Sequence, residues 1–119
     1  MQKKEQAFQI LFNKWIHEKW IGGSACFELK VAKTDTILLS AFRQHQIVSL
    51  LAAKRGKLHY KITDSGYSFK PFDSFILCKS EAYGVIKFLS GAVMLDIDVL
   101  IKKRKWIYKE AKENGIRLW

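Results

Sequence analysis

The chain has few residues of the kinds that break, cross-link or loosen a fold. Its 119 residues include one proline, Pro71, and two cysteines, and no stretch reads as a repeat, a linker or a low-complexity tract. Because Cys26 and Cys78 lie among apolar residues, we expect two small buried side chains and neither a disulfide nor a metal site. Residues 1–119 are predicted to form a single domain, since 49% of them are hydrophobic but the chain is too short for a second core.

Long hydrophobic runs are also missing. The apolar stretch of residues 83–99 is interrupted by Lys87, Asp96 and Asp98, so no segment is long enough to span a bilayer. The first six residues lead into an amphipathic pattern and not into an apolar leader. We therefore expect a soluble protein without a membrane partner, located in the cytoplasm of a bacterial or archaeal cell or inside the host cell of a virus.

Acidic residues are scarce, with 11 Asp and Glu against 21 Lys and Arg, and the formal net charge is +10. This imbalance predicts a polyanionic partner, which is nucleic acid or, as a weaker alternative, a membrane surface contacted by a basic closing helix with Trp106. Phosphate contacts supply most of the sequence-independent affinity for DNA. The side chains expected to make them are Lys3, Lys4, Lys33, Arg43, His45, Lys54, Arg55, Lys57 and Lys70. For any single one of them the alternative is a solvated basic face, and for His45 it is packing within the protein.

Hydrophobic periodicity predicts an α/β protein in which a central mixed sheet is flanked by helices. The expected helices span residues 2–20, 40–55 and 99–114, and the expected strands span residues 26–32, 58–62, 72–78, 83–89 and 92–97. Ser40 and Asp98 are predicted to cap the second and third helices, and Gly56 to end the second. Pro71 suits the first position of a strand that continues through residues 72–78 and pairs with residues 83–89 as a hairpin.

An acidic and a basic side chain alternate on the first predicted strand. Side chains alternate between the two faces of a strand, so Phe27, Leu29 and Val31 point one way while Glu28 and Lys30 share the other face. A carboxylate can ligate a hard divalent metal, and a neighbouring ammonium can position a water or stabilise an oxyanion, as phosphodiester hydrolysis requires. The alternative is a surface ion pair on a half-exposed strand.

The first half of the chain, to about Ile62, resembles the Holliday-junction resolvases of the PD-(D/E)XK nuclease superfamily, both the archaeal and the bacterial RecU type. The resemblance rests on Glu5 in the first helix, on Phe27-Glu28-Leu29-Lys30-Val31, on the polar turn Lys33-Thr34-Asp35, and on His45-Gln46 in the second helix. It implies a restriction-endonuclease-like fold and a metal-dependent endodeoxyribonuclease that uses Mg²⁺ or Mn²⁺ to cut branched DNA as a homodimer. Glu28 would then be a metal ligand and Lys30 the catalytic lysine.

The sequence departs from the family in the position of one aspartate. The family places a metal-binding aspartate on a strand ahead of the E-x-K motif, yet no acidic residue lies between Glu18 and Glu28. The segment Lys70-Pro71-Phe72-Asp73 and the strands after it resemble the family's aspartate hairpin, moved downstream. We therefore expect Asp73 to complete the site, and the alternative is that Asp73 only caps a strand or pairs with Lys70.

The resemblance also suggests a role for each remaining candidate. Glu28, Asp73 and the carbonyl of Leu29 would hold one or two Mg²⁺ ions, with Lys30 as an electrostatic stabiliser. Glu5 would reach the metal through water, or else is simply solvated, and Gln46 would orient a phosphate or the attacking water. The alternative function is a non-catalytic nucleic-acid-binding module, in which the acid and the lysine form a structural pair and exposed aromatic side chains stack on bases.

Overall fold

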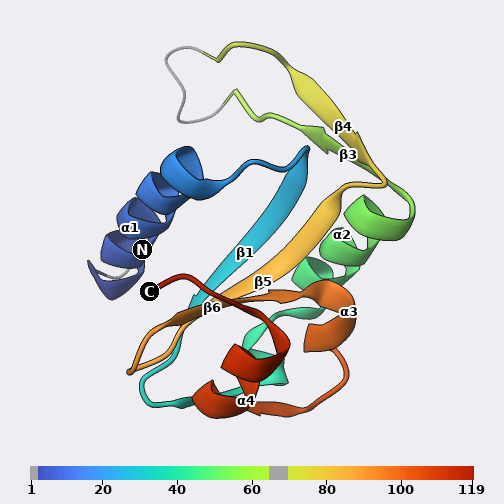
Figure 1. Ribbon diagram of the computed structural model, residues 1–119. Coiled ribbons are helices and arrows are strands. Elements are labelled where there is room, and N and C mark those ends of the chain that lie inside the picture. Colours follow the sequence, from blue (N-terminus) through green and yellow to red (C-terminus); the bar gives the residue numbers. More distant parts are fainter. Residues whose placement is uncertain (1–2, 65–69) are drawn as a thin grey trace.

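A four-stranded mixed sheet lies at the centre of the computed structural model, which describes residues 3–64 and 70–119 (Figure 1). Its strands lie in the order β1 (Ala25–Val31), β5 (Glu81–Lys87), β6 (Ala92–Asp96) and β8 (Ile116–Arg117). β1 and β5 are parallel, whereas β6 is antiparallel to both of its neighbours. β1 therefore forms one edge of this sheet.

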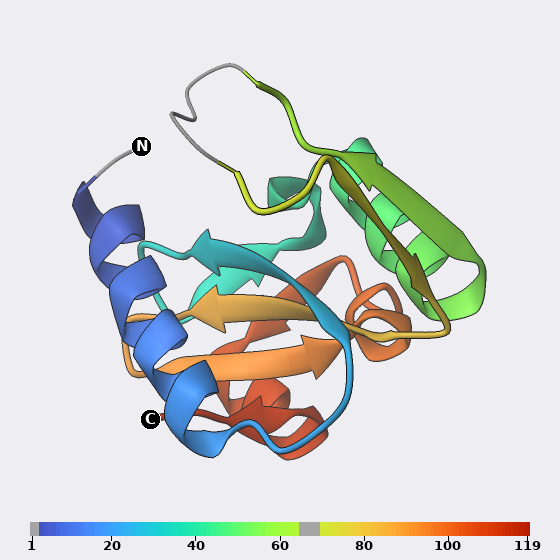
Figure 2. The ribbon, with the colours of Figure 1, turned by 90° about the horizontal axis from the view of Figure 1, so that it is seen from above.

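Helices cover both faces of the sheet (Figures 1 and 2). α1 (Lys3–Lys19) packs on one face, where its Phe8 and Phe12 are buried. The other face is covered by α2 (Gln44–Arg55), α3 (Ile97–Leu100) and α4 (Tyr108–Asn114). The predicted α/β class, with a central mixed sheet flanked by helices, is confirmed.

Alternation along β1 decides which side chains reach each face. Phe27 and Leu29 pack into the apolar cluster under α1, whereas Cys26 packs into the cluster on the α2 side. Glu28 and Lys30 share the side of Cys26, as a period of two residues requires. Because β1 is an edge strand, side chains from both of its faces border the same open edge.

Two smaller sheets complete the fold. β2 (Thr36–Leu38) pairs with β7 (Lys105–Ile107), and the 3-10 turn η1 (Leu39–Ala41) follows β2. β3 (Lys57–Lys61) and β4 (Ser74–Cys78) pair as an antiparallel ribbon that projects from the end of the central sheet, at the top of Figure 1. We call this pair of strands the ribbon.

The predicted pairing of residues 72–78 with residues 83–89 is wrong. β4 pairs with β3, and β5 lies between β1 and β6. Side chains of β5 are buried almost throughout, so this strand needs neighbours on both edges and cover on both faces, whereas β4 is largely exposed. Lys79, with a positive φ of 53°, separates the two strands.

The second helix begins at Gln44, and the predicted cap at Ser40 is wrong because Ser40 lies in η1. Arg43 is the N-cap residue, and its backbone N–H donates to the Gln46 side chain at 2.9 Å. Gln46, three residues after the N-cap residue, thus supplies the hydrogen-bond acceptor for the backbone N–H of Arg43 at the start of the helix. Gly56 ends α2 as predicted.

The predicted closing helix is interrupted by β7. Asp96, and not Asp98, caps α3, because the Asp96 carboxylate accepts the N–H of Asp98 at 2.9 Å. On β7, Trp106 is only 2% exposed, and its indole N–H donates to the carbonyl of Leu100 at 2.9 Å. Burying Trp106 beside β2 outweighs the local helical pattern of the basic segment.

The environment of the two cysteines also differs from the prediction. Cys26 is half-buried in β1, and Cys78 is exposed at the end of β4. Both are free thiols, and burial raises the pKa of Cys26. Pro71 precedes β4, which begins at Ser74, so it occupies the approach to the strand and not its first position.

Candidate active site

Glu28 and Lys30 lie side by side on β1, as their spacing predicts. The Lys30 ammonium is 3.5 Å from Oε1 of Glu28, and the two side chains are 22% and 29% exposed, respectively. The same ammonium lies 5.9 Å from the ring centroid of the buried Phe42. The Lys30 ammonium thus lies between a carboxylate and an aromatic face, and both contacts position it beside Glu28.

Gln46 connects the start of α2 to this carboxylate. Its Nε2 donates to Oε1 of Glu28 at 2.7 Å, while its Oε1 accepts the N–H of Arg43 at 2.9 Å. The two contacts together fix the orientation of the amide, because only one assignment of its O and N satisfies both. Among the described residues, no side chain hydrogen bonds to the second oxygen of Glu28, so one of its oxygens remains available for a ligand.

The structure brings Glu5 and Glu28 to the same cavity, which has a volume of about 320 Å³. Lys30 and Leu29 also border this cavity, and so does Gln9, one helical turn after Glu5. Glu5 is exposed on the first turn of α1. The predicted acid of the first helix therefore faces the same space as the acid of β1.

A second cavity, of about 420 Å³, adjoins the first and shares Glu28 with it. It lies between β1, α2 and the ribbon, and His45, Gln46, Ser49 and Tyr60 border it. The sequence interpretation missed Ser49 and Tyr60 as site residues. Alternation along β3, which puts Tyr60 on the same side as the apolar Leu58, is the sequence signal for Tyr60.

A third cavity, of about 340 Å³, extends the first one toward the start of α1. It shares Glu5 with the first cavity, and Lys3, Lys4 and Lys33 border it. We call the three adjoining cavities together the β1 groove. Three of the predicted phosphate-binding lysines thus lie at one end of the groove, and Glu28 lies near its middle.

Asp73 lies outside the β1 groove, on the segment that leads into β4. Its carboxylate is 87% exposed and is 3.0 Å from the Lys70 ammonium, which also contacts Asp64. Hydrogen bonds to Asp64 and Asp73 raise the pKa of Lys70. The structure therefore shows the ion pair of the alternative interpretation, and it does not bring Asp73 to Glu28.

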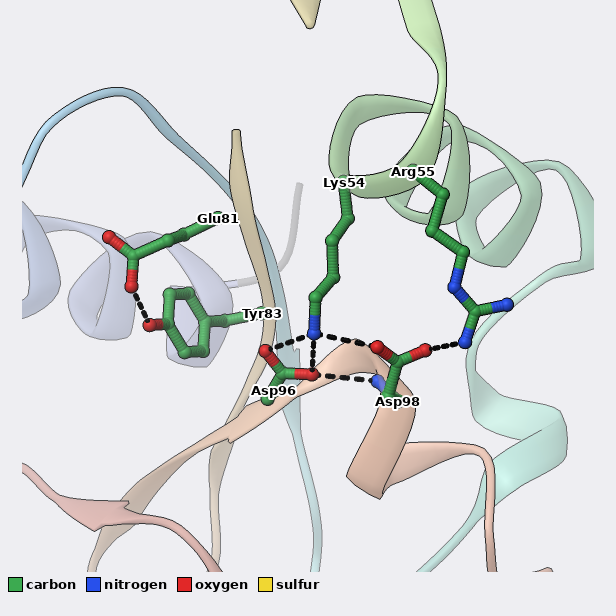
Figure 3. Close-up of polar contacts among 6 residues, drawn as sticks. All are labelled: Lys54, Arg55, Glu81, Tyr83, Asp96 and Asp98. Carbon is green, nitrogen blue, oxygen red and sulfur yellow. Dashed lines mark hydrogen bonds and ion pairs between the residues drawn. The ribbon is translucent and has the colours of Figure 1, made fainter. Parts of the chain in front are cut away.

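Two other predicted phosphate contacts, Lys54 and Arg55, are engaged within the protein (Figure 3). The Lys54 ammonium lies 2.6 Å from a carboxylate oxygen of Asp96 and 2.6 Å from one of Asp98, and Arg55 pairs with Asp98. The hydrogen bond from Lys54 lowers the pKa of Asp98. These ion pairs tie the end of α2 to the junction of β6 and α3 and balance both cations locally.

The remaining predicted cations stay exposed. Arg43 lies at the start of α2 and Lys57 at the start of β3, and both side chains are open to solvent. Both elements border the second cavity. Both side chains are therefore available to bind a polyanion, Arg43 at the start of α2 and Lys57 on the ribbon.

The carboxylates of the β1 groove suit magnesium better than a softer metal. No three His, Cys, Asp or Glu side chains form a metal-binding group within residues 3–64 and 70–119. Mg²⁺ is commonly bound by one or two carboxylates together with waters and substrate phosphates. Glu5 and Glu28, in one open cavity beside Lys30, fit that mode of binding.

Comparison of the chain with protein-family models, with curated proteins and with solved structures finds no match in any of the three. Across the described part of the chain, none of the helices has both the length and the apolar character that crossing a bilayer requires.

Proposed function

We propose that the chain is a metal-dependent endodeoxyribonuclease that hydrolyses a phosphodiester bond in branched DNA, with four-way junctions as its substrate. The observation that carries this proposal is the arrangement around Glu28, whose carboxylate contacts Lys30 and Gln46 and shares a cavity with Glu5. The resemblance of the first half of the chain to the PD-(D/E)XK resolvases supports the same chemistry, together with a restriction-endonuclease-like arrangement of the core.

Glu28 and Glu5 would hold Mg²⁺ or Mn²⁺ in this groove, with the carbonyl of Leu29 as a further oxygen donor. Such an ion, when bound, polarises the scissile phosphate and lowers the pKa of a bound water. The Gln46 amide holds one oxygen of Glu28 in place, so the other oxygen is oriented before the substrate binds. Lys30 supplies a fixed positive charge where negative charge develops on the phosphate.

Lys3, Lys4 and Lys33 would bind the phosphates that flank the scissile bond, since they border the groove next to Glu5. A two-fold homodimer would present two grooves to two strands of a junction, which is the reason we propose a dimer. We also propose that the protein works inside a cell, where branched DNA is formed.

The function is tested by incubating the native chain with a labelled four-way junction and with a linear duplex of the same sequence. Paired symmetric nicks in the junction, present with Mg²⁺ or Mn²⁺ and absent with EDTA, are the expected result. A chain that binds the junction but nicks neither substrate with any divalent metal would instead be a non-catalytic nucleic-acid-binding module. The exposed lysines at one end of the β1 groove, Lys3, Lys4 and Lys33, support this second candidate as well.

The second acid of the site is tested with Glu5→Gln and Asp73→Asn, which remove one charge each without changing the size of the side chain. We expect Glu5→Gln to slow nicking by at least about tenfold, which is the typical effect of changing a residue that reaches the metal through a water or another ligand. Asp73→Asn should nick at the native rate, because Asp73 pairs with Lys70 outside the groove. If Asp73→Asn abolishes nicking instead, Asp73 is part of the site, and the assignment of Glu5 as its second acid is wrong.

A further inference from the structure

Tyr60 and Phe75 form an exposed aromatic pair on the ribbon. They lie opposite each other in the register of β3 and β4, with ring centroids 5.4 Å apart and ring planes only 23° from parallel. Tyr60 is 55% exposed and Phe75 37% exposed. Their neighbours on the same side of the ribbon, Leu58 and Leu77, are half-buried. The stacked pair is thus an aromatic surface that remains partly open to solvent.

This aromatic surface adjoins the candidate catalytic carboxylate. Tyr60 borders the second cavity together with Glu28, Gln46 and His45. Both strands of the ribbon contact α2, and Figure 1 shows the ribbon leading away from the end of that helix. The volume of the cavity, about 420 Å³, falls within the range of roughly 300–1,000 Å³ typical of small-ligand sites. A planar group on Tyr60 would therefore lie next to Glu28.

The charges around Tyr60 favour an anionic ligand. Arg43 lies exposed at the start of α2, beside the cavity that Tyr60 borders, and the exposed Lys57 and Lys61 lie on β3 on the other side of the ribbon. A cross-strand aromatic pair also stabilises an isolated ribbon. Yet a pair buried within the protein would serve that purpose better than the exposed pair observed here. Aromatic side chains beside cations are the combination with which proteins bind unpaired nucleotides.

We propose that Tyr60, backed by Phe75, stacks on an unpaired nucleobase of DNA and so selects branched or single-stranded sites over paired duplex. A base within a duplex has both faces covered by its neighbours, whereas a base at a branch point or bulge exposes a face to Tyr60. This inference rests on the proposed function, in which Glu28, the metal-binding carboxylate, borders the same cavity as Tyr60. It adds the structural feature by which the substrate is recognised.

The test uses a duplex with one bulged 2-aminopurine, whose fluorescence is quenched when the base stacks, and the same duplex with that base paired. Binding is measured in EDTA, so that no cleavage is required. The native chain should quench the bulged probe and bind it more tightly than the paired one. Tyr60→Leu, which keeps an apolar side chain on the ribbon, should abolish the quenching and weaken binding of the bulged DNA by about 5- to 150-fold.

Two matched variants separate stacking from folding of the ribbon. Tyr60→Phe keeps the aromatic face and should quench and bind as the native chain does. His59→Ala, on the opposite side of the ribbon, should leave both affinities within about twofold. Far-UV circular dichroism and thermal unfolding show whether each variant remains folded.

The proposal is overturned if the folded Tyr60→Leu variant binds the bulged probe like the native chain. Equal loss of affinity for bulged and paired DNA would also overturn it, because stacking on an unpaired base must discriminate between them. The proposed nuclease function fails separately: a chain that stacks on the bulge in EDTA but never nicks DNA with Mg²⁺ retains this inference and loses the catalytic one.

Discussion

Replacing Gln46 with glutamate should make the stability of the protein depend on pH through a new contact with Glu28. A glutamate at this position can still accept the N–H of Arg43, as in a capping box. Its other oxygen, however, would lie where Nε2 of Gln46 now donates to Glu28 at 2.7 Å. Two carboxylates at that separation resist being ionised together.

The magnitude follows from the pKa of the introduced carboxyl group. Since the neighbouring groups are partly exposed, we expect that pKa to rise about one to two units above the usual value of about 4.3. Each unit corresponds to about 1.4 kcal/mol. The folded state then binds more protons than the unfolded state between the two pKa values, so stability falls as the pH rises from about 4 to about 6. At pH 7 the variant should be about 1.5–3 kcal/mol less stable than the native chain, and near pH 4 almost equal to it.

The assay is urea unfolding of the native chain, Gln46→Glu and Gln46→Ala at several pH values between 4 and 7. Gln46→Ala loses the contacts to Arg43 and Glu28 at every pH, so its deficit should stay near about 1–2 kcal/mol throughout. If the free energies of unfolding of the native chain and Gln46→Glu differ by the same amount at pH 4 and pH 7, Gln46 does not contact Glu28.

Two further predictions concern the core and the ion pairs that hold α2. Gly84→Ala should lower the free energy of unfolding by about 1–3 kcal/mol, because the added Cβ would lie 2.7 Å from the Leu100 side chain. Gly23→Ala should lower it far less, since no atom lies within 4 Å of its added Cβ. Thermal unfolding of the two variants tests this difference. Lys54→Met should lower the free energy of unfolding by about 1–2 kcal/mol at pH 7, since it removes the ammonium that pairs with both Asp96 and Asp98. The lowered pKa of Asp98 stabilises the fold above the unfolded pKa of about 3.9, and this stabilisation is lost as the pH falls through the folded pKa. The difference in the free energy of unfolding between the native chain and Lys54→Met, measured with urea, should therefore be smaller at pH 3 than at pH 7. An equal difference at both pH values would contradict the ion pair between Lys54 and Asp98.

The sequence pattern predicted those helices and strands whose conformation is determined by residues close together in the sequence. The apolar residues of α1 recur at helical spacing, and the alternation along β1 placed Glu28 beside Lys30. Gly56 ends α2 where a glycine after a helical segment predicts an end. In each case the residues that determine the conformation lie within one or two turns, or a few strand positions, of one another.

The failed predictions depend on partners that are distant in the sequence. Strand pairing is one example, since β5 takes β1 as its neighbour from more than fifty residues earlier in the chain. The break in the closing helix is another, because Trp106 is buried beside β2. A local pattern contains no information about either partner.

In the candidate site, too, the residues that were predicted depend on short-range spacing, and the residues that were missed depend on contacts distant in the sequence. Spacing and resemblance identified Glu28, Lys30 and Gln46, which the fold does bring into contact. Tyr60 was missed because its place beside Glu28 depends on how the ribbon lies against α2. The hypothesis that Asp73 joins the site depended on where a hairpin would fold, which spacing along the chain does not determine.

The central claim is that the carboxylate of Glu28 is required for metal-dependent hydrolysis of DNA. Its most direct test is the single-turnover rate of junction nicking with Mg²⁺, compared among the native chain, Glu28→Gln and Glu113→Gln. Glu113 lies on the exposed surface of α4, outside the β1 groove, so its variant controls for the change of charge alone. We expect Glu28→Gln to bind the junction but to nick it at least about a hundredfold more slowly, and Glu113→Gln to nick it at the native rate. If Glu28→Gln nicks the junction at the native rate, Glu28 is not required for hydrolysis.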